Sequence, residues 1–241
     1  MKKKEIKKIN VNFEEVKASF KFQNYNSIQF RNHISKSIPN YNGLRKLIPS
    51  IASNFLVKNS NIYDIGCSAG DLILELSERF LPIHDDLSFV GYDIADNLLP
   101  NLEFAENCSF FPRDVTEENL KFFNTSLIFS LFTLQFIELP KRKKLVQKIY
   151  DSLDKRGAFI VCEKIYSNNG FTEDIFTFSN YDSKIENLFE EKEILNKQRD
   201  LRSMMYPLSQ KENEDMFKEA GFEIVEVFFK SLNFIGWLLV K

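Results

Sequence analysis

The segment NIYDIGCSAGDLILELSERF, residues 61–80, constrains the fold more than any other part of the chain. Its apolar run IYDI is interrupted by Gly66 and Gly70 and then resumes at helical spacing, which predicts a buried strand, a tight turn and a helix. Gly66 can adopt a positive φ, and Gly70 allows the helix to begin close to the strand. A ligand can therefore approach the backbone between the two glycines, although packing alone would also explain the turn.

Four more apolar stretches are predicted strands joined by helical segments. They are LSFVGYD (87–93), CSFF (108–111), SLIFSLF (126–132) and GAFIVCE (157–163). Apolar strands without alternation, joined by helices, are typical of a parallel sheet that is covered on both faces. Ser209 and Glu212 form a capping box for a last helix, and EIVEVFF and FIGWLLV follow as two strands of hairpin length. We therefore predict an α/β, Rossmann-like fold with a mostly parallel seven-stranded sheet and a terminal antiparallel hairpin.

The pattern also suggests how the chain is divided. Residues 1–42 are predicted to form a lysine-rich tail and a helical cover, and residues 43–241 a cofactor-binding domain. Within that domain the strand–helix rhythm breaks after the fifth strand, so residues 165–206 are predicted to be a helical insertion. The aromatic stretch 171–189 in this insertion favours a dimer or lid surface over a ligand pocket.

The composition argues against several classes of function. The net charge is −2, so the chain has no overall basic field for nucleic acid and we expect no direct binding to it. Three widely spaced cysteines without a C-x-x-C pair indicate reduced thiols in a cytoplasmic protein, and two histidines are too few for a histidine-rich metal site. No apolar run approaches the roughly 20 residues that cross a bilayer, so we expect no membrane partner.

Three aspartates are predicted at the carboxyl ends of the first three strands, where a parallel sheet binds its ligands. Asp64 can receive a cofactor ammonium group, Asp93 can accept both hydroxyls of a ribose, and Asp114 can accept the exocyclic amine of an adenine. Ser68 stands where a dinucleotide fingerprint has the glycine that admits a pyrophosphate. The pattern favours S-adenosylmethionine over a dinucleotide, and a site that binds neither is the remaining alternative.

The end of the predicted fifth strand carries two charged residues, Glu163 and Lys164, close to the expected substrate. Lys164 can bind a carboxylate, and Glu163 can act as a base. A structural ion pair explains the two residues equally well.

Four longer segments carry a family resemblance. They are SIPNYNGL, IYDIGCSAG, FTLQFIELPKRKKLVQKIYDSLDKRGAFIVCEK and LRSMM…KEAGFEIVEVFFKSLNF. In this order and spacing they resemble the carboxy-S-adenosyl-L-methionine synthase family, over most of the chain from about residue 20 to 234. The resemblance implies a homodimer with a class I methyltransferase fold that does not methylate. Family members are described as joining the carbon dioxide lost from prephenate to the methyl carbon of S-adenosylmethionine, which leaves phenylpyruvate and a product used in modifying a transfer RNA wobble uridine.

The resemblance also assigns site residues. The implied set of contacts to S-adenosylmethionine or carboxy-S-adenosylmethionine is Tyr41, Asp64, Gly66, Cys67, Ser68, Gly70, Asp93, Ile94, Asp114, Val115, Leu131 and Arg202. Arg202 would also be catalytic, because it matches the arginine that grips the added carboxylate, and a planar guanidinium can hold a carboxylate by two hydrogen bonds. From the residues alone, a surface ion pair of Arg202 with neighbouring acids is the preferred interpretation.

Two positions depart from the family pattern. The family usually has Asn where this chain has Ile94 and Leu131, and Leu131 replaces a polar group beside the reactive methyl. This change leaves room for an altered substrate, or for a plain methyltransferase that acts on a small molecule. A cofactor-binding protein with a regulatory role is a third alternative. The leading hypothesis is a transferase that resembles carboxy-S-adenosylmethionine synthase.

Overall fold

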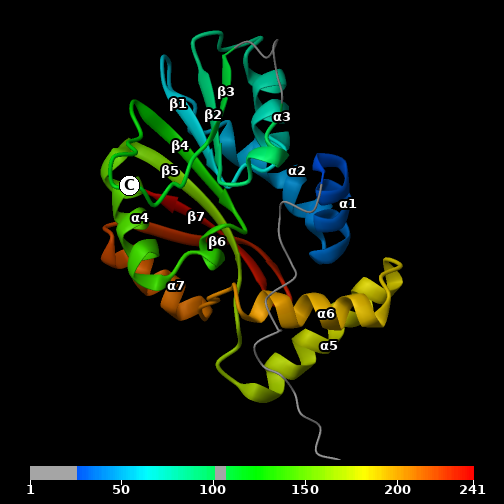
Figure 1. The fold of residues 1–241 in the computed structure, drawn as a ribbon. Helices are drawn as coiled ribbons and strands as arrows, with labels where there is room; N and C mark the ends of the chain where they lie inside the picture. Colours follow the sequence, from blue (N-terminus) through cyan, green and yellow to red (C-terminus); the bar gives the residue numbers. More distant parts are fainter. Residues whose placement is uncertain (1–25, 101–106) are drawn as a thin grey trace, which may run out of the picture.

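A mixed sheet of seven strands forms the centre of the protein in a computed structural model that describes residues 26–100 and 107–241 (Figure 1). The strands are β1 (Asn61–Ile65), β2 (Ser88–Asp93), β3 (Cys108–Pro112), β4 (Thr125–Leu131), β5 (Leu153–Lys164), β6 (Ile224–Ser231) and β7 (Phe234–Val240). Their order across the sheet is β3-β2-β1-β4-β5-β7-β6. The first five strands pair in parallel and β7 is antiparallel to both of its neighbours, which confirms the predicted sheet and its terminal hairpin.

Helices cover both faces of the sheet. They are α1 (Ser27–Ser37), α2 (Tyr41–Ala52), α3 (Asp71–Phe80), α4 (Leu139–Ser152), α5 (Gly170–Glu186), α6 (Glu191–Arg202) and α7 (Gln210–Glu219). Helices α2 and α3 share a hydrophobic cluster with one face, and α4 and α7 share another cluster with the opposite face. The described part of the chain therefore has three layers, helix, sheet and helix.

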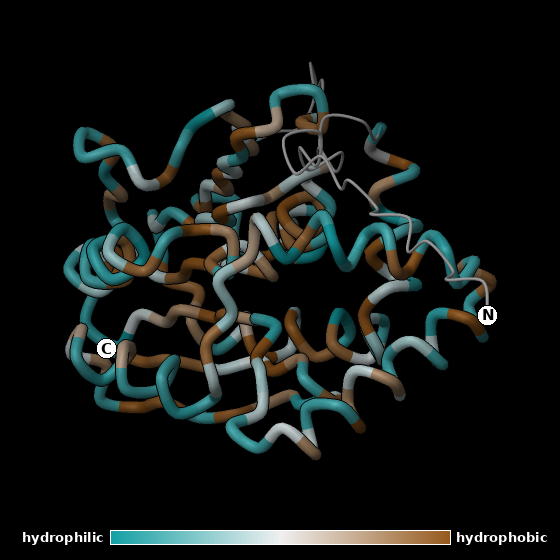
Figure 2. Tube along the Cα trace, turned by 60° about the horizontal axis from the view of Figure 1, so that its bottom comes forward, coloured by the Kyte–Doolittle hydropathy of each residue, from teal (hydrophilic) through white to brown (hydrophobic). Residues whose placement is uncertain are grey.

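Strand β4 shows why the strand sequences are continuously apolar. Leu127 and Phe129 belong to the cluster with α2 and α3, whereas Ile128 belongs to the cluster with α4 and α7, and all three are fully buried. Because successive side chains point to opposite faces, a strand covered on both sides needs apolar residues at every position. Figure 2 shows the resulting distribution, with brown segments toward the interior and teal segments on the outer helices and loops.

Helices α1, α5 and α6 lie beyond the carboxyl ends of the parallel strands (Figure 1). Arg31 of α1 forms an ion pair with Asp71 of α3, and Asn187, which follows α5, donates a 3.0 Å hydrogen bond to the backbone oxygen of Lys36. Helices α5 and α6 occupy the predicted insertion between β5 and α7, and residues 1–25 of the predicted cover lie outside the described residues. The domain boundaries stay a prediction.

Membrane insertion has no candidate among the helices of residues 26–100 and 107–241. None of them is both long enough and apolar enough to span a bilayer.

Candidate active site

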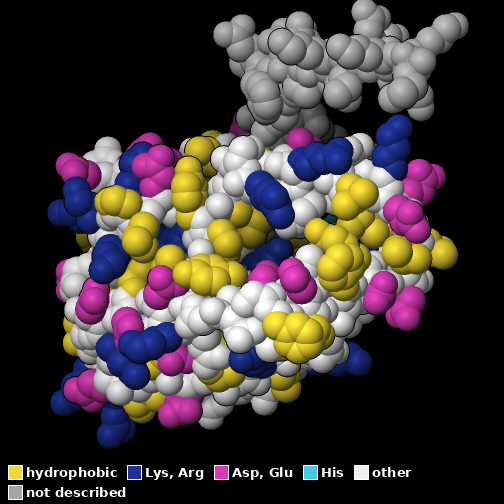
Figure 3. Space-filling model, turned by 90° about the horizontal axis from the view of Figure 1, so that it is seen from below, with side chains coloured by type: hydrophobic (Ala, Val, Ile, Leu, Met, Phe, Trp, Pro, Cys, Tyr) yellow, Lys and Arg dark blue, Asp and Glu magenta, His cyan; other side chains and the backbone are white. Residues whose placement is uncertain are grey.

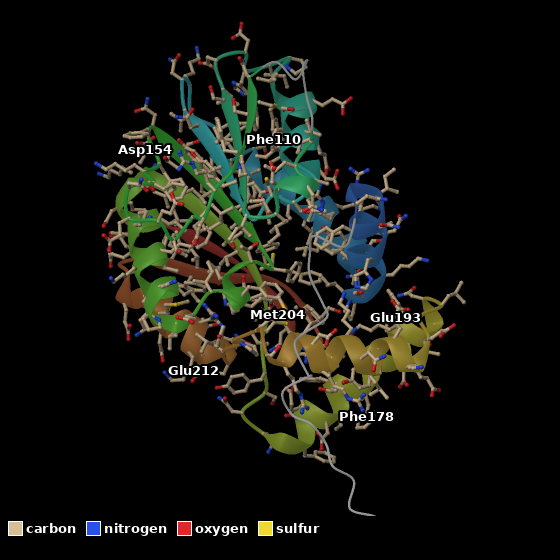
Figure 4. The ribbon with its side chains drawn as sticks, in the orientation of Figure 1. Phe110, Asp154, Phe178, Glu193, Met204 and Glu212 are labelled. Carbon is tan, nitrogen blue, oxygen red and sulfur yellow. The ribbon has the colours of Figure 1, made fainter. Side chains whose placement is uncertain are left out.

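A cavity of about 560 Å³ lies at the carboxyl ends of the parallel strands. Its walls come from the loops after β1 to β4, from the end of β5 and from α1, α2, α5 and α6. Figure 4 places Met204, one of its lining residues, just beyond the central strands, whereas Phe178 lies on α5 farther from the sheet. The cavity is thus where open parallel sheets bind ligands.

The turn after β1 forms one wall of this cavity. Gly66 has a φ of 76°, and a Cβ at that position would lie 2.0 Å from the Thr133 hydroxyl oxygen, so no larger residue fits without moving the neighbouring loop. Ser68 also has a positive φ, of 49°, which costs a non-glycine residue on the order of 1–3 kcal/mol. The Ser68 hydroxyl is buried and finds no hydrogen-bond partner among the described residues. Strain and an unpaired hydroxyl together mark this turn as a ligand-binding segment.

Asp93 connects this turn to the end of β2. Its Oδ2 accepts a 2.8 Å hydrogen bond from the backbone N–H of Ser68, and its Oδ1 accepts one of 2.8 Å from the backbone N–H of Ala95. Burial raises the pKa of Asp93, and these hydrogen bonds oppose that shift. Each carboxylate oxygen retains a lone pair, so Asp93 can accept two further donors, such as a pair of ribose hydroxyls.

Asp64 is the clearest unsatisfied group in the cavity. It is 3% exposed, and burial raises its pKa to about 7. Its Oδ1 has no hydrogen-bond partner within the part of the chain that the structure describes. A buried oxygen of this kind is costly unless a donor meets it, and a cofactor ammonium group would supply both a donor and the opposite charge. The residues therefore fit an amino-acid-bearing cofactor.

The third strand end supplies the remaining polar contact expected for an adenine. Oδ1 of Asp114 accepts both the backbone N–H and the hydroxyl of Thr116, at 2.8 and 2.7 Å. This arrangement fixes the carboxylate and leaves Oδ2 for a ligand. The apolar side chains of Ile94 and Val115 line the cavity beside it.

The loop after β4 forms the wall next to the glycine turn. Phe132 is 8% exposed with a φ of 63°, a strained conformation for a bulky residue, and its ring lies near those of Tyr41 and Phe234. The backbone N–H of Phe132 donates a 2.6 Å hydrogen bond to the carbonyl of Cys162 on β5. Together with Leu131, this ring gives the cavity an apolar side.

Glu163 of β5 anchors this loop by hydrogen bonds to its backbone. Its two carboxylate oxygens accept hydrogen bonds from the backbone N–H groups of Leu134 and Gln135, at 2.9 and 2.7 Å. It is 1% exposed, and Lys164 rather than Glu163 is among the residues that line the cavity. The geometry therefore favours a structural role for Glu163. Lys164 lines the cavity, so its predicted role in binding a carboxylate remains possible.

Comparison with known proteins places the chain in a family. It is 32% identical over 216 residues to the carboxy-S-adenosyl-L-methionine synthase of Staphylococcus epidermidis, covering 88% of this chain and 92% of the relative. The synthase of Campylobacter lari is 33% identical over 234 residues, covering 94% and 96%. The chain belongs to the carboxy-S-adenosyl-L-methionine synthase family. This membership confirms the predicted family, the predicted class of transferase and S-adenosylmethionine as the predicted cofactor.

Solved structures agree on the fold. Human N-acetylserotonin methyltransferase in complex with S-adenosylmethionine matches with a TM-score of 0.57 and 16% identity, over 89% of this chain and 55% of that one. Magnesium protoporphyrin IX methyltransferase from Synechocystis matches with a TM-score of 0.56 and 14% identity, over 90% and 88%. At these identities the likeness shows the predicted class I methyltransferase fold alone. No protein-family model matches the chain.

The structure brings most of the family's predicted contacts together. The cavity-lining residues among them are Tyr41, Asp64, Gly66, Cys67, Ser68, Asp93, Ile94, Asp114, Val115 and Leu131. Gly70 is not in the lining; it has a φ of 72°, and a Cβ there would lie 2.6 Å from the Phe110 ring, so its demonstrable role is the start of α3. Arg202 is exposed at the end of α6 and is also outside the lining. Its contact with a carboxylate stays a prediction.

Several polar residues of the cavity wall are absent from the set of contacts predicted from the family resemblance, among them three on α5 and α6. Asn180 and Lys184 come from α5, and Lys197 comes from α6, where its ammonium group contacts the His33 ring. On a helix, such residues have the sequence pattern of a solvated face. Only the packing of α5 and α6 against α1 turns them inward, and no local signal in the sequence reports it.

Proposed function

We propose that this protein converts S-adenosylmethionine and prephenate to carboxy-S-adenosylmethionine and phenylpyruvate, in the cytoplasm, for the modification of transfer RNA wobble uridines. Family membership supports the carboxy-S-adenosylmethionine product. Prephenate as the donor, the transfer RNA pathway and the cytoplasm rest on the family resemblance of the sequence.

The reaction balances without an external oxidant or reductant. Prephenate loses one carboxylate as carbon dioxide together with its ring hydroxyl as hydroxide, and its ring becomes aromatic. The methyl group of S-adenosylmethionine loses a proton and forms a carbon–carbon bond to the carbon dioxide. The proton and the hydroxide combine to water, so the protein must position the two reactants and keep bulk water away from the carbon dioxide.

One observation carries this proposal, namely the order of side chains along the edge of the sheet. Asp114 lies just beyond β3, Asp93 ends β2, and Asp64 is the last residue but one of β1. Leu131 ends β4 and is followed by Phe132, and Lys164 ends β5. The acids suit the adenosine and the ammonium group of the cofactor, and when bound the cofactor supplies the methyl carbon that receives the carboxyl group. The apolar pair would then face the sulfonium end, with a cationic side chain on the donor's side.

A plain methyltransferase that acts on a small molecule is the second candidate. Leu131 favours it, because this apolar residue lines the cavity where the family usually has a polar side chain. The two candidates share the cofactor but differ in their products.

The test is to incubate the purified protein with S-adenosylmethionine and prephenate and to identify the products by mass spectrometry. We expect S-adenosylmethionine heavier by the mass of one carbon dioxide, with an equal amount of phenylpyruvate. A reaction without prephenate is the control. Formation of S-adenosylhomocysteine with no carboxylated product would support the methyltransferase instead.

A further inference from the structure

Positively charged side chains gather in the part of the cavity wall formed by the end of β5 and by α5 and α6. Lys164 at the end of β5 and Lys184 on α5 both line it, and Lys197 of α6 lines it as well. The β4–β5 pairing places Leu131 beside Cys162, so Lys164 follows two residues beyond the apolar wall of the cavity. Figure 3 views the protein from the side of α5 and α6, where cationic side chains stand among hydrophobic ones.

Two of these lysines are half-buried and close enough for their charges to interact. Burial, together with the smaller effect of the charge of Lys164, lowers the pKa of Lys184 to about 8. Burial lowers the pKa of Lys164, and the charge of Arg202 lowers it too. The charge of Glu173 acts in the opposite direction. Within residues 26–100 and 107–241 neither lysine forms an ion pair, and the Glu173 oxygens accept hydrogen bonds from Ser167 and Thr177. Like charges that are partly removed from water are unfavourable until an anion joins them.

Asn180 gives a second and independent indication of a ligand. It lies one helical turn before Lys184 on α5, lines the same cavity and is 3% exposed. Its Oδ1 has no hydrogen-bond partner among the described residues. Because the amide oxygen and nitrogen can exchange places by a flip, Asn180 can present a donor to an anion.

We propose that Lys164, Lys184 and Asn180 form a subsite for the carboxylate that the donor keeps, not for the one that it loses. This inference rests on the proposed function, in which the donor is a dicarboxylate. The group that leaves as carbon dioxide loses its charge, so a cation bound to it would stabilise the reactant and slow the reaction. That group belongs against the apolar Leu131 and Phe132, while the retained carboxylate anchors the donor.

Prephenate and phenylpyruvate make this assignment testable, because phenylpyruvate carries only the retained carboxylate. Each would be titrated by calorimetry into the protein saturated with S-adenosylhomocysteine, which has no methyl group to react. We expect Lys184→Met and Lys164→Met to weaken both ligands by a similar factor, about 10- to 100-fold, the range for a hydrogen bond to a charged group. Lys192→Met, an exposed lysine of α6, is the matched control and should change neither.

Proton uptake gives a signature that a purely structural lysine would lack. At pH 8 about half of Lys184 is uncharged, and a bound carboxylate raises its pKa, so binding should take up protons in the wild type. Titrations in two buffers of different ionisation heat measure this uptake. Lys184→Arg should recover most of the affinity but show little proton uptake, because its guanidinium is always charged.

The possible failures separate from one another. If the two methionine variants bind prephenate more weakly but bind phenylpyruvate as the wild type does, the lysines hold the leaving carboxylate and our assignment is wrong. If both ligands bind the variants as tightly as they bind the wild type, there is no such subsite. If phenylpyruvate binding depends on the lysines but prephenate gives no carboxylated product, the subsite stands and the proposed function fails.

Discussion

The backbone N–H of Ser68 donates a 2.8 Å hydrogen bond to Oδ2 of Asp93, which joins the ends of the two neighbouring strands β1 and β2. The same carboxylate that holds the strained turn is also the one predicted to receive the ribose of the cofactor. This dual use makes Asp93 the residue on which the geometry of the cofactor end depends most.

Replacing Asp93 by Ala should weaken the binding of S-adenosylmethionine by about 1.5–3 kcal/mol, the range for hydrogen bonds to a charged acceptor. Calorimetric titration of the cofactor measures this loss. Asp96→Ala is the control, because Asp96 is exposed and outside the cavity lining. An unchanged affinity in Asp93→Ala would mean that the ribose binds elsewhere.

The raised pKa of Asp64 predicts a pH dependence of stability. In the folded protein this pKa is about 7, above its ordinary value of 3.8, so folding takes up a proton between these pH values. The contribution of Asp64 to stability is therefore fully present below about pH 4 and is lost as pH rises toward 7. Without cofactor, Asp64→Asn should unfold at a higher temperature relative to wild type at pH 8 than at pH 5, measured by calorimetry. An equal difference at both pH values would refute the shift.

Glu163→Gln should lower the free energy of unfolding by about 1–3 kcal/mol, because the new amide N–H₂ would face a backbone donor of Leu134 or Gln135. Urea denaturation provides the measurement. Glu219→Gln alters an exposed pair with Lys143 and should stay within about 0.5 kcal/mol of wild type. A neutral Glu163→Gln would show that the loop is held mainly by other contacts.

The apolar surface of α5 supports the prediction of a homodimer. Phe171 is 74% exposed and Phe178 is 64% exposed, and both lie in the aromatic stretch 171–189. Phe178→Asp should shift sedimentation at micromolar concentration toward the 28.3 kDa monomer. Phe123 is 63% exposed but lies outside the stretch 171–189, so Phe123→Asp should leave the sedimentation unchanged. A wild-type monomer would remove the interface role of this surface.

Arg202 can be tested against the carboxylated cofactor directly. If its guanidinium grips the added carboxylate, Arg202→Ala should weaken carboxy-S-adenosylmethionine much more than S-adenosylmethionine, and Arg202→Lys should recover only part of the loss. Arg202 is exposed and lies outside the lining of its own cavity, so a contact across a dimer has to be considered. The two titrations should therefore be interpreted together with the sedimentation result, which shows whether a dimer is present. Equal losses for the two ligands would leave Arg202 a structural residue.

The cofactor half of the site could be predicted because its signals are local. Gly66 indicates a turn, the aspartates Asp64, Asp93 and Asp114 lie at or near the ends of β1, β2 and β3, and the structure places all four residues in one cavity. The capping box of Ser209 and Glu212 is local in the same way, and both of its hydrogen bonds are present. Asn180 and Lys184 escape such reasoning, because their burial depends on helices that meet through contacts distant in sequence.

The predicted cofactor contacts and the proposed anion subsite come from separate stretches of the chain. The predicted cofactor contacts that line it come from residues 41–131, whereas the anion subsite comes from the end of β5 and from α5, in residues 164–184. A gene can therefore inherit the first stretch unchanged while mutations accumulate in the second. Within one fold, evolution can thus change the substrate that reacts with the cofactor without changing the cofactor-binding residues.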